Sequence, residues 1–219
     1  MIIAKNVTCK YQNGDKVLTV LDNVSFEIKD GEFVIITGAS GSGKTTLLKI
    51  LSGIQKPNSG EVYWDHVNLY QLSNRLQSKL RIKESGFIYQ DFMLIDELNV
   101  YDNIKLQQVL NNKKDKSMIN EIINILNIQH LIKKYPQTLS GGQKQLVAIG
   151  RALVNNPRIL FCDEPTGSLD YIATKEIMDL LKKLNQELGV TIILVTHEQE
   201  NLSYASRIIK YHNGMLECD

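Results

Sequence analysis

Two glycine-bearing motifs that lie far apart in the chain together predict a nucleotide site. The first is the run Gly38-Ala39-Ser40-Gly41-Ser42-Gly43-Lys44-Thr45, which lies between a strand pattern and a helix pattern. The second is Leu139-Ser140-Gly141-Gly142-Gln143, which comes shortly before an apolar run that ends in Asp163 and Glu164. Small residues at the start of a helix let backbone N–H groups approach phosphate oxygens. The two motifs together predict ATP hydrolysis.

The residue types of the first motif each suit one part of a triphosphate. Gly38, Gly41 and Gly43 permit a close approach of the backbone. Lys44 adds a mobile cation for the outer phosphates, and the Thr45 hydroxyl can ligate Mg²⁺. The alternative is a glycine-rich turn without a ligand. A strand before the loop and a helix after it favour the phosphate site.

Acidic residues follow one predicted strand, and a histidine follows the next. Asp163 and Glu164 end the strand at 159–162, at the sheet edge where open α/β folds bind their ligands. Adjacent carboxylates alternate in direction, so we expect one to face Mg²⁺ and the other to address a water molecule. The alternative is a plain strand end with solvated acids. His197 could be a buried structural histidine, but its position at the same edge favours a functional role.

Strand and helix patterns predict an α/β fold. After two β-rich segments at 2–11 and 17–28, separated by Asn13-Gly14-Asp15, the chain alternates strands and helices. We expect strands at 33–37, 61–64, 159–162 and 191–196, a helix at 45–51 closed by Gly53, a helical region at 91–156 and a final hairpin around Asn213-Gly214. The lysine-rich stretch 113–116 is interpreted as a solvated loop. The pattern predicts a mostly parallel sheet interrupted by a helical lobe.

Apolar stripes mark two of the expected helices. Ile119, Ile122, Ile123 and Leu126 share one face of the first. In the second, after the strand at 159–162, the stripe consists of Ile177, Leu180, Leu181, Leu184 and Leu188.

Composition excludes several classes of protein. With 219 residues, of which 43% are hydrophobic, the chain can bury a core as one large domain or two intimate lobes. A net charge of +1 gives no basic field that would attract nucleic acid or an anionic bilayer. Cys9, Cys162 and Cys218 are odd in number and lack metal-ligand spacing, which favours a reducing cytosol. No secretory signal opens the chain, and apolar runs such as 190–195 are far shorter than a membrane span.

The order of these motifs resembles the ATP-binding-cassette ATPases over essentially the whole chain. The matching residues are Gly38 to Thr45, Gln90, Leu139 to Gln143, Asp163-Glu164, Ser168-Leu169-Asp170 and His197. The resemblance implies a single nucleotide-binding domain over 1–219, with a RecA-like P-loop NTPase core. That core would comprise 1–90 and 157–219, with an antiparallel β part, and 91–156 would form a helical signature subdomain.

The same resemblance implies roles for individual residues. Glu164 would polarise the attacking water, His197 would contact the γ-phosphate, and Gln90 and Lys44 would complete the catalytic set. Thr45, Gln90 and, through its water shell, Asp163 would hold Mg²⁺. Tyr11 would stack on adenine, although structural packing is its alternative role. The implied nucleotide contacts are Tyr11, Gly38, Ala39, Ser40, Gly41, Ser42, Gly43, Lys44, Thr45 and Thr46, with Ser140, Gly141, Gly142, Gln143 and Asp170.

Partners also follow from the resemblance. Two copies of the chain would sandwich two ATP molecules, each between the phosphate loop of one copy and the Ser140 motif of the other. Hydrolysis would remove the bridging anion and loosen the dimer. Phe92, Met93 and Leu94 would form part of a groove for a helix of an integral-membrane permease, with core packing as the alternative. The chain would then lie in the cytoplasm, peripheral to the inner face of the cell membrane, without nucleic acid.

Details within the motifs resemble one branch of the family. Tyr135-Pro136 and the segment 163–170 are similar to lipoprotein-release, macrolide-export, antimicrobial-peptide-resistance and cell-division cassettes. Two positions depart from that pattern, because Leu146 replaces a common arginine and Gly150 a common alanine. Glycine at position 150 should cost its helix up to about 1 kcal/mol relative to alanine.

Four functions remain open at this stage. The first is the ATPase subunit of a transporter or extruder, and the second a mechanical or regulatory ATPase that drives an extracytoplasmic enzyme through a membrane partner. A soluble cassette of translation or DNA repair is disfavoured because the chain has neither a tandem duplication nor a coiled-coil insertion. A P-loop kinase would leave the motif at 139–143 without a role.

Overall fold

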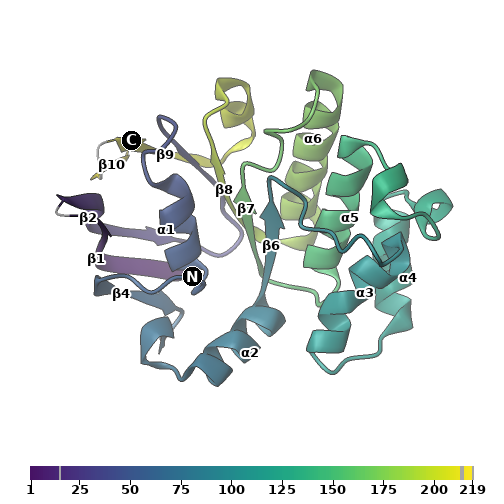
Figure 1. The fold of residues 1–219 in the computed structure, drawn as a ribbon, viewed down its shortest axis with the longest axis horizontal. Coiled ribbons are helices and arrows are strands. Elements are labelled where there is room, and N and C mark those ends of the chain that lie inside the picture. Colours follow the sequence, from purple (N-terminus) through teal and green to yellow (C-terminus); the bar gives the residue numbers. More distant parts are fainter. Residues whose placement is uncertain (15, 213–214, 219) are drawn as a thin grey trace.

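The chain is built on two β-sheets with helices packed around them (Figure 1). The computed structural model describes residues 1–14, 16–212 and 215–218. Its six-stranded sheet has the order β10-β9-β3-β8-β7-β6, and its four-stranded sheet has the order β2-β1-β4-β5. This arrangement confirms the predicted α/β class, with a mostly parallel sheet, an antiparallel N-terminal part and added helices.

The elements follow one another with helices and strands mixed along the chain. In order they are β1 (Ile2–Asn13), β2 (Lys16–Ile28), β3 (Phe33–Thr37), α1 (Lys44–Leu51), β4 (Ser59–Trp64), β5 (Val67–Asn68), α2 (Asn74–Glu84), β6 (Ser85–Tyr89), α3 (Val100–Leu110), α4 (Lys116–Ile125), α5 (Gly141–Leu153), β7 (Ile159–Asp163), α6 (Tyr171–Leu188), β8 (Thr191–Thr196), β9 (Arg207–His212) and β10 (Met215–Cys218). Short 3-10 turns lie at Leu69–Gln71, Gln129–Leu131, Pro136–Thr138 and Gln199–Tyr204. Among the described residues, no helix has both the length and the apolar composition needed to cross a bilayer.

Parallel pairing brings the carboxyl ends of four strands to one edge of the larger sheet. β3 pairs with β8, β8 with β7 and β7 with β6, all in parallel. Every residue of β3 and β8 is buried, because helices or the second sheet cover both faces of these strands. In register, Thr37 lies opposite Thr196, and Asp163 lies opposite both Val195 and Tyr89. The segments after these four strands therefore start side by side.

The two faces of this sheet carry different layers. On one face, Val34, Ile36 and Phe161 pack with α1 and the antiparallel sheet, and the Trp64 and Phe161 rings stack with centroids 5.9 Å apart. On the other face, Ile35 and Leu160 pack with helices α3 to α6. Figure 1 shows α1 and α5 on opposite sides of the central strands. Helix α1 follows the phosphate loop and α5 follows Ser140, so the two glycine motifs are carried by different faces.

Several predicted elements differ from those observed. The sequence interpretation placed no element between Trp64 and Gln90, whereas the structure has β5, α2 and β6 there. Helix α2 contains no buried residue, so it lacks the apolar stripe by which helices are found. The stretch at 113–116 is a loop only as far as Asp115, whose side chain accepts a hydrogen bond from the Met118 N–H and starts α4 at Lys116.

The predicted helix stripes are mostly confirmed. All four apolar residues named for the first stripe are buried, along α4 and at its C-terminal cap. In α6, however, Leu188 is exposed and Met178 is fully buried instead, because Leu188 is the last helical residue before the left-handed Gly189. The final strands β9 and β10 pair antiparallel as a hairpin requires, but the turn at 213–214 lies outside the described residues.

Two glycines set how closely α5 approaches its neighbours. A Cβ on Gly86 of β6 would lie 2.5 Å from the backbone oxygen of Ala152 and 2.9 Å from its Cβ. A Cβ on Gly150 would lie 2.9 Å from Leu126 Cδ1 and 3.2 Å from Ile104 Cδ1. The glycine at position 150 thus makes room for α3 and α4, which offsets the helix-propensity cost expected from sequence.

Substitution by alanine should separate these two glycines. Gly86→Ala should lower the free energy of unfolding by about 1–3 kcal/mol, because its Cβ meets a backbone atom that cannot move alone. Gly150→Ala should change it by less, since only side-chain ends must shift and helix propensity improves by up to about 1 kcal/mol. Urea unfolding followed by circular dichroism measures both, and equal stabilities of Gly86→Ala and the parent protein would contradict this packing.

Candidate active site

The edge where the parallel strands end gathers most of the predicted site residues. The loop at 38–43 follows β3, Gln90 follows β6, Glu164 follows Asp163 at the end of β7, and His197 follows β8. This is the edge at which open α/β sheets bind ligands. The strand register therefore brings together residues that are up to 159 positions apart in the chain, from Gly38 to His197.

The phosphate loop is shaped by glycine backbone geometry. Gly41 and Gly43 have φ angles of 73° and 111°, which side chains rarely adopt. A Cβ on Gly38 would lie 2.1 Å from the Tyr211 backbone oxygen. Gly43 is the N-cap of α1 and provides no side-chain cap, so the first N–H groups of this helix have no side-chain partner from it. Such a helix start attracts anions.

The side chain of Lys44, the first residue of α1, folds back onto this loop. Its Nζ donates hydrogen bonds to the backbone oxygens of Gly38 at 2.9 Å and Ala39 at 2.8 Å, and the residue is only 4% exposed. Burial lowers the pKa of the ammonium, and the charges of Glu164 and Asp163 oppose that shift. A buried cation whose hydrogen bonds go to neutral carbonyls gains from meeting phosphate oxygens instead.

Further polar atoms of the loop support an oxygen-rich ligand. Ser42 Oγ is buried, and it has no hydrogen-bond partner within the described part of the chain. Ser40 is exposed at the tip of the loop. Tyr11 is 42% exposed beside α1, where its hydroxyl accepts a 2.6 Å hydrogen bond from Gln55 and lies 3.5 Å from Thr46 Oγ1. The Tyr11 ring is thus tethered at its hydroxyl and partly open to solvent.

A hydroxyl and a carboxylate converge next to the loop. Thr45 Oγ1 donates a 2.8 Å hydrogen bond to Asp163 Oδ1. Burial raises the pKa of the Asp163 carboxyl, and the hydrogen bond from Thr45 opposes this. The described ranges contain no group of three or more His, Cys, Asp or Glu side chains that is arranged to hold a metal ion. One carboxylate and a hydroxyl suit Mg²⁺, which keeps several waters and takes further oxygens from phosphates.

Glu164 points to a different partner from its neighbour Asp163. Its Oε1 lies 3.2 Å from His197 Nδ1, and its backbone N–H donates a 3.0 Å hydrogen bond to the Val195 oxygen. Its φ angle of 44° is in the left-handed region, which costs about 1–3 kcal/mol for a residue with a side chain and is common at functional sites. A Cβ on Gly167 would lie 3.0 Å from Gln90 Nε2 and 3.5 Å from Glu164 Oε2. The expected alternation of the two carboxylates is therefore present, with Gln90 close to Glu164.

The residues of the second glycine motif, Leu139 to Gln143, lie apart from the residues gathered at the carboxyl edge of the sheet. Ser140 and Gln143 form a reciprocal cap at the start of α5, with the Gln143 N–H donating to Ser140 Oγ at 3.3 Å and the Ser140 N–H donating to Gln143 Oε1 at 3.2 Å. Ala173, which follows the α6 N-cap Asp170, lies 3.2 Å from where a Cβ on Gly142 would be. The structure thus places the predicted site residues in two separate groups, one at the phosphate loop and one at the starts of α5 and α6.

Sequence reasoning missed three polar residues that join the segments of this edge. Thr166, Glu198 and Asn201 form hydrogen bonds with one another. The signal available in the sequence was only proximity, because Glu198 follows His197 and Thr166 comes two residues after Glu164.

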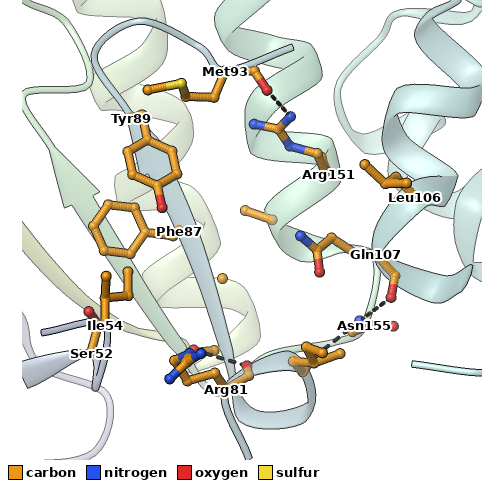
Figure 2. A pocket seen from close by; sticks show the side chains of 14 residues that line it. Ser52, Ile54, Arg81, Phe87, Tyr89, Met93, Leu106, Gln107, Arg151 and Asn155 are labelled. Carbon is orange, nitrogen blue, oxygen red and sulfur yellow. Dashed lines mark hydrogen bonds between the residues drawn. The ribbon is translucent and has the colours of Figure 1, made fainter. Parts of the chain in front are cut away.

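A groove of about 410 Å³ opens beside this edge, between β6 and helices α2, α3 and α5 (Figure 2). Of the three residues expected to line a groove for a permease helix, Met93 lines this one, whereas Phe92 and Leu94 do not. Leu94 packs against the helical core, which was the alternative interpretation, and the Phe92 ring is 4.0 Å from where a Cβ on Gly141 would lie. Phe92 and Met93 both have positive φ angles, 59° and 50°, which turn the chain sharply at this point. The side chains of Phe92 and Leu94 therefore point away from the groove.

Buried polar groups line the same groove. Arg151 donates a hydrogen bond to the backbone oxygen of Met93 (Figure 2) and another, at 2.7 Å, to that of Phe92. Burial lowers the pKa of its guanidinium. Asn155 donates to Ile82 and Gln107, whereas its Oδ1 has no partner among the described residues. The described lining includes Arg81 and Arg151 and no carboxylate.

The fold and the edge define a class of protein before any comparison. A parallel sheet, a glycine loop that opens a helix, a buried lysine and a Thr–Asp pair are the parts of a P-loop nucleotide hydrolase. In this class catalysis consists mainly of positioning and electrostatic stabilisation of the phosphates.

Comparison with known proteins identifies the family. The ABC transporter family model matches residues 21–167. The uncharacterized ABC transporter ATP-binding protein MJ1508 of Methanocaldococcus jannaschii is 44% identical over 99% of this chain and 97% of its own length. The methionine import ATP-binding protein MetN of Carboxydothermus hydrogenoformans is 41% identical over 99% of this chain and 65% of its own length.

A solved structure has the same fold. It is the dimeric structure of a post-hydrolysis state of the ATP-binding cassette MJ0796 bound to ADP and Pi, with a TM-score of 0.91 and 39% identity over 99% of this chain and 97% of that one. The chain therefore belongs to the ATP-binding-cassette (ABC) transporter family, as an ATP-hydrolysing subunit that uses ATP and Mg²⁺.

Replacement of Lys44 by alanine tests the buried ammonium. Lys44→Ala should weaken MgATP binding by about a hundredfold or more, since a charge-assisted contact to phosphate is lost in a buried loop. Isothermal titration calorimetry measures the affinity, and Lys56→Ala, which removes an exposed lysine, is the matched control. Equal affinities of the two variants would exclude Lys44 from the phosphate site.

Proposed function

We propose that two copies of this chain clasp two MgATP molecules and thereby drive a separate membrane permease. The observation that carries this proposal is the placement of the two glycine motifs, whose helices α1 and α5 pack on opposite faces of one sheet. A single chain cannot close both motifs on one nucleotide while the sheet lies between them. A second copy, turned to face the first, can supply the missing half.

The phosphate-loop half binds the nucleotide in this proposal. The loop at 38–46 holds the phosphates, with Lys44 exchanging its carbonyl partners for phosphate oxygens, and Tyr11 stacks on the base. Thr45, Asp163 and Gln90 hold Mg²⁺. When bound, the ion neutralises charge that develops on the phosphate oxygens.

Glu164 acts as the general base in this proposal. Its contact with His197 Nδ1 and its backbone hydrogen bond to Val195 fix the carboxylate at the carboxyl edge of the sheet, next to Lys44. A carboxylate held there can accept the proton of the attacking water, and His197 can contact the terminal phosphoryl group.

The Ser140 half completes the site in the other copy. The cap uses the Ser140 and Gln143 N–H groups, whereas Gly141 and Gly142 provide first-turn N–H groups without helical partners. Together with the helix dipole they suit an anionic γ-phosphate. Asp170 begins α6 beside this cap, so it lies where contact with the other copy can be relayed.

A division of the chain into two lobes would couple ATP hydrolysis to a movement of helices. In our proposal, 1–90 and 157–219 form the nucleotide-binding core, and 91–156 forms the helical signature lobe. The lobe joins the core through the segment after Gln90, where Arg151 of α5 holds the Phe92 and Met93 carbonyls. A change at Gln90 would thus reach α5 through a short, hydrogen-bonded path, so the lobe is the natural lever.

The groove of Figure 2 is the proposed docking site for the permease. Its lining combines apolar atoms with two arginines and the unpaired Asn155 Oδ1, and it includes no carboxylate among the described residues. This charge balance suits a partner helix that carries an acidic side chain. Docking there would place the chain at the cytoplasmic face of the membrane. The resemblance of 135–136 and 163–170 to extruder-type cassettes supports a permease of that branch.

Removal of the base should trap the clasped state. Glu164→Gln should lower ATP turnover by about a hundredfold or more, because the amide cannot accept the proton of water. It should still bind MgATP and elute as a dimer in gel filtration, since the phosphate bridge is then not cleaved.

The exposed Glu97→Gln variant is the control for the loss of one negative charge, and we expect it to turn over normally. A Glu164→Gln protein that hydrolyses ATP at the parent rate would remove the proposed base. One that binds MgATP and stays monomeric, with the permease present, would remove the clasp.

A polar substitution in the groove tests permease docking. Met93→Asn removes a side chain that is 55% exposed, and asparagine tolerates the φ angle of 50° at this position. Affinity for the permease that co-purifies with the parent protein should fall about tenfold or more if Met93 is an interface anchor. Leu76→Asn, on α2 outside the groove lining and 53% exposed, is the control. Unchanged co-purification of Met93→Asn with the permease would place docking elsewhere.

A further inference from the structure

A closed triangle of hydrogen bonds lies just behind Glu164 and His197. Thr166 Oγ1 donates to Glu198 Oε2 at 2.7 Å, and Asn201 Nδ2 donates to the same oxygen at 2.6 Å. Asn201 Nδ2 also lies 3.1 Å from Thr166 Oγ1, which accepts from it. Thr166 is 1% exposed and Asn201 is 2% exposed. Water therefore has little access to two of the three members, and they depend on one another for their hydrogen bonds.

The triangle joins the two segments that carry the proposed catalytic pair. Thr166 lies two residues after Glu164 in the segment that follows β7. Glu198 is the neighbour of His197 and starts the 3-10 turn that contains Asn201. The Glu198 N–H also donates a 3.0 Å hydrogen bond to Thr196 Oγ1, which fixes this segment to the end of β8.

A third segment is tied to the same point. The Thr166 backbone oxygen accepts a 2.9 Å hydrogen bond from the Leu169 N–H, which orders the turn leading to Asp170. Ser168 Oγ donates a 3.2 Å hydrogen bond to the Gln90 oxygen. Thr166 thus connects Glu164, the turn at 166–169 and the His197 segment, all of which lie at the carboxyl edge of the sheet.

The backbone conformation of Glu164 needs support from the residues around it. With a φ angle of 44°, Glu164 holds a conformation that persists only where the surroundings impose it. The direct restraints from the His197 side are the Val195 hydrogen bond and the 3.2 Å contact with His197, whose side chain is 51% exposed. An exposed imidazole is a weak support by itself. The triangle, in which Thr166 and Asn201 are buried, supplies a firm one.

We propose that Thr166, Glu198 and Asn201 are positioning residues that hold Glu164 and His197 in register for ATP hydrolysis. The proposal rests on the roles given above to Glu164 and His197. The three residues need not touch nucleotide, and they act through the geometry of the pair. A displacement of about 1 Å at a reacting group costs about a hundredfold in rate, so a loss of the triangle should appear in turnover and not in binding.

Substitutions at Glu198 distinguish positioning from charge. Glu198→Ala removes the acceptor shared by Thr166 and Asn201, and its kcat should fall between about tenfold and about a hundredfold with KM for MgATP unchanged. Glu198→Gln keeps a carbonyl oxygen that can accept both hydrogen bonds, and it should retain kcat within about threefold. Glu200→Ala removes an exposed acid from the same turn and should turn over like the parent protein.

A second pair of variants keeps the test decisive if Glu198→Ala fails to fold. Thr166→Val preserves shape but removes the hydroxyl, so kcat should fall as for Glu198→Ala. Thr166→Ser restores the hydroxyl and should restore kcat. Thermal unfolding of every variant shows whether lost turnover comes with lost folding.

The possible results separate this inference from the proposed function. If the parent hydrolyses ATP and Glu164→Gln does not, the proposed role of Glu164 stands and the triangle is judged by its own variants. Parent-like kcat for Glu198→Ala or Thr166→Val would then overturn the positioning role, as would a change in KM alone. Loss of kcat in Thr166→Val that Thr166→Ser does not restore would also overturn it. A slow Thr166→Val rescued by Thr166→Ser, at unchanged KM, supports it.

Discussion

The parallel register of β3, β8, β7 and β6 is the constraint on which the site depends. It brings the ends of four strands to one edge, so that the phosphate loop, Gln90, Glu164 and His197 meet although the chain separates them widely. Buried apolar strands covered on both faces fix this register, since a shift by one residue would turn core side chains to the wrong layer. The chemistry is therefore an outcome of core packing.

Burial at this edge disfavours the charged forms of both Lys44 and Asp163. Burial lowers the pKa of Lys44 and raises that of Asp163, and each is partly compensated by the other's charge or by hydrogen bonds. The edge thus holds a cation and carboxylates that gain little from one another and can gain more from a metal-bound polyphosphate. That difference favours the binding of MgATP at this edge.

The sheet also acts as a partition. Because α1 packs on one face and α5 on the other, the two helix starts proposed to bind phosphate cannot serve one nucleotide within a monomer. In our proposal, dimerisation around ATP follows from this architecture, and the related cassette MJ0796 has a dimeric structure bound to ADP and Pi. The path from Gln90 through Phe92 and Met93 to Arg151 gives α5 a direct link to the same edge.

Much of this was determined by the sequence itself, because local backbone requirements leave visible marks. The glycines of the phosphate loop, the strand before it, the cap formed by Ser140 and Gln143, and the acidic end of β7 all follow from residue types at short spacing. Tertiary structure alone decided what depends on contacts between distant segments. Helix α2 was missed because it buries no residue, the function of Gly150 became visible only against Ile104 and Leu126, and Phe92 and Leu94 left the groove through a turn with positive φ angles. The triangle of Thr166, Glu198 and Asn201 likewise exists only because the ends of β7 and β8 are neighbours, and no spacing along the chain encodes a hydrogen bond between strands.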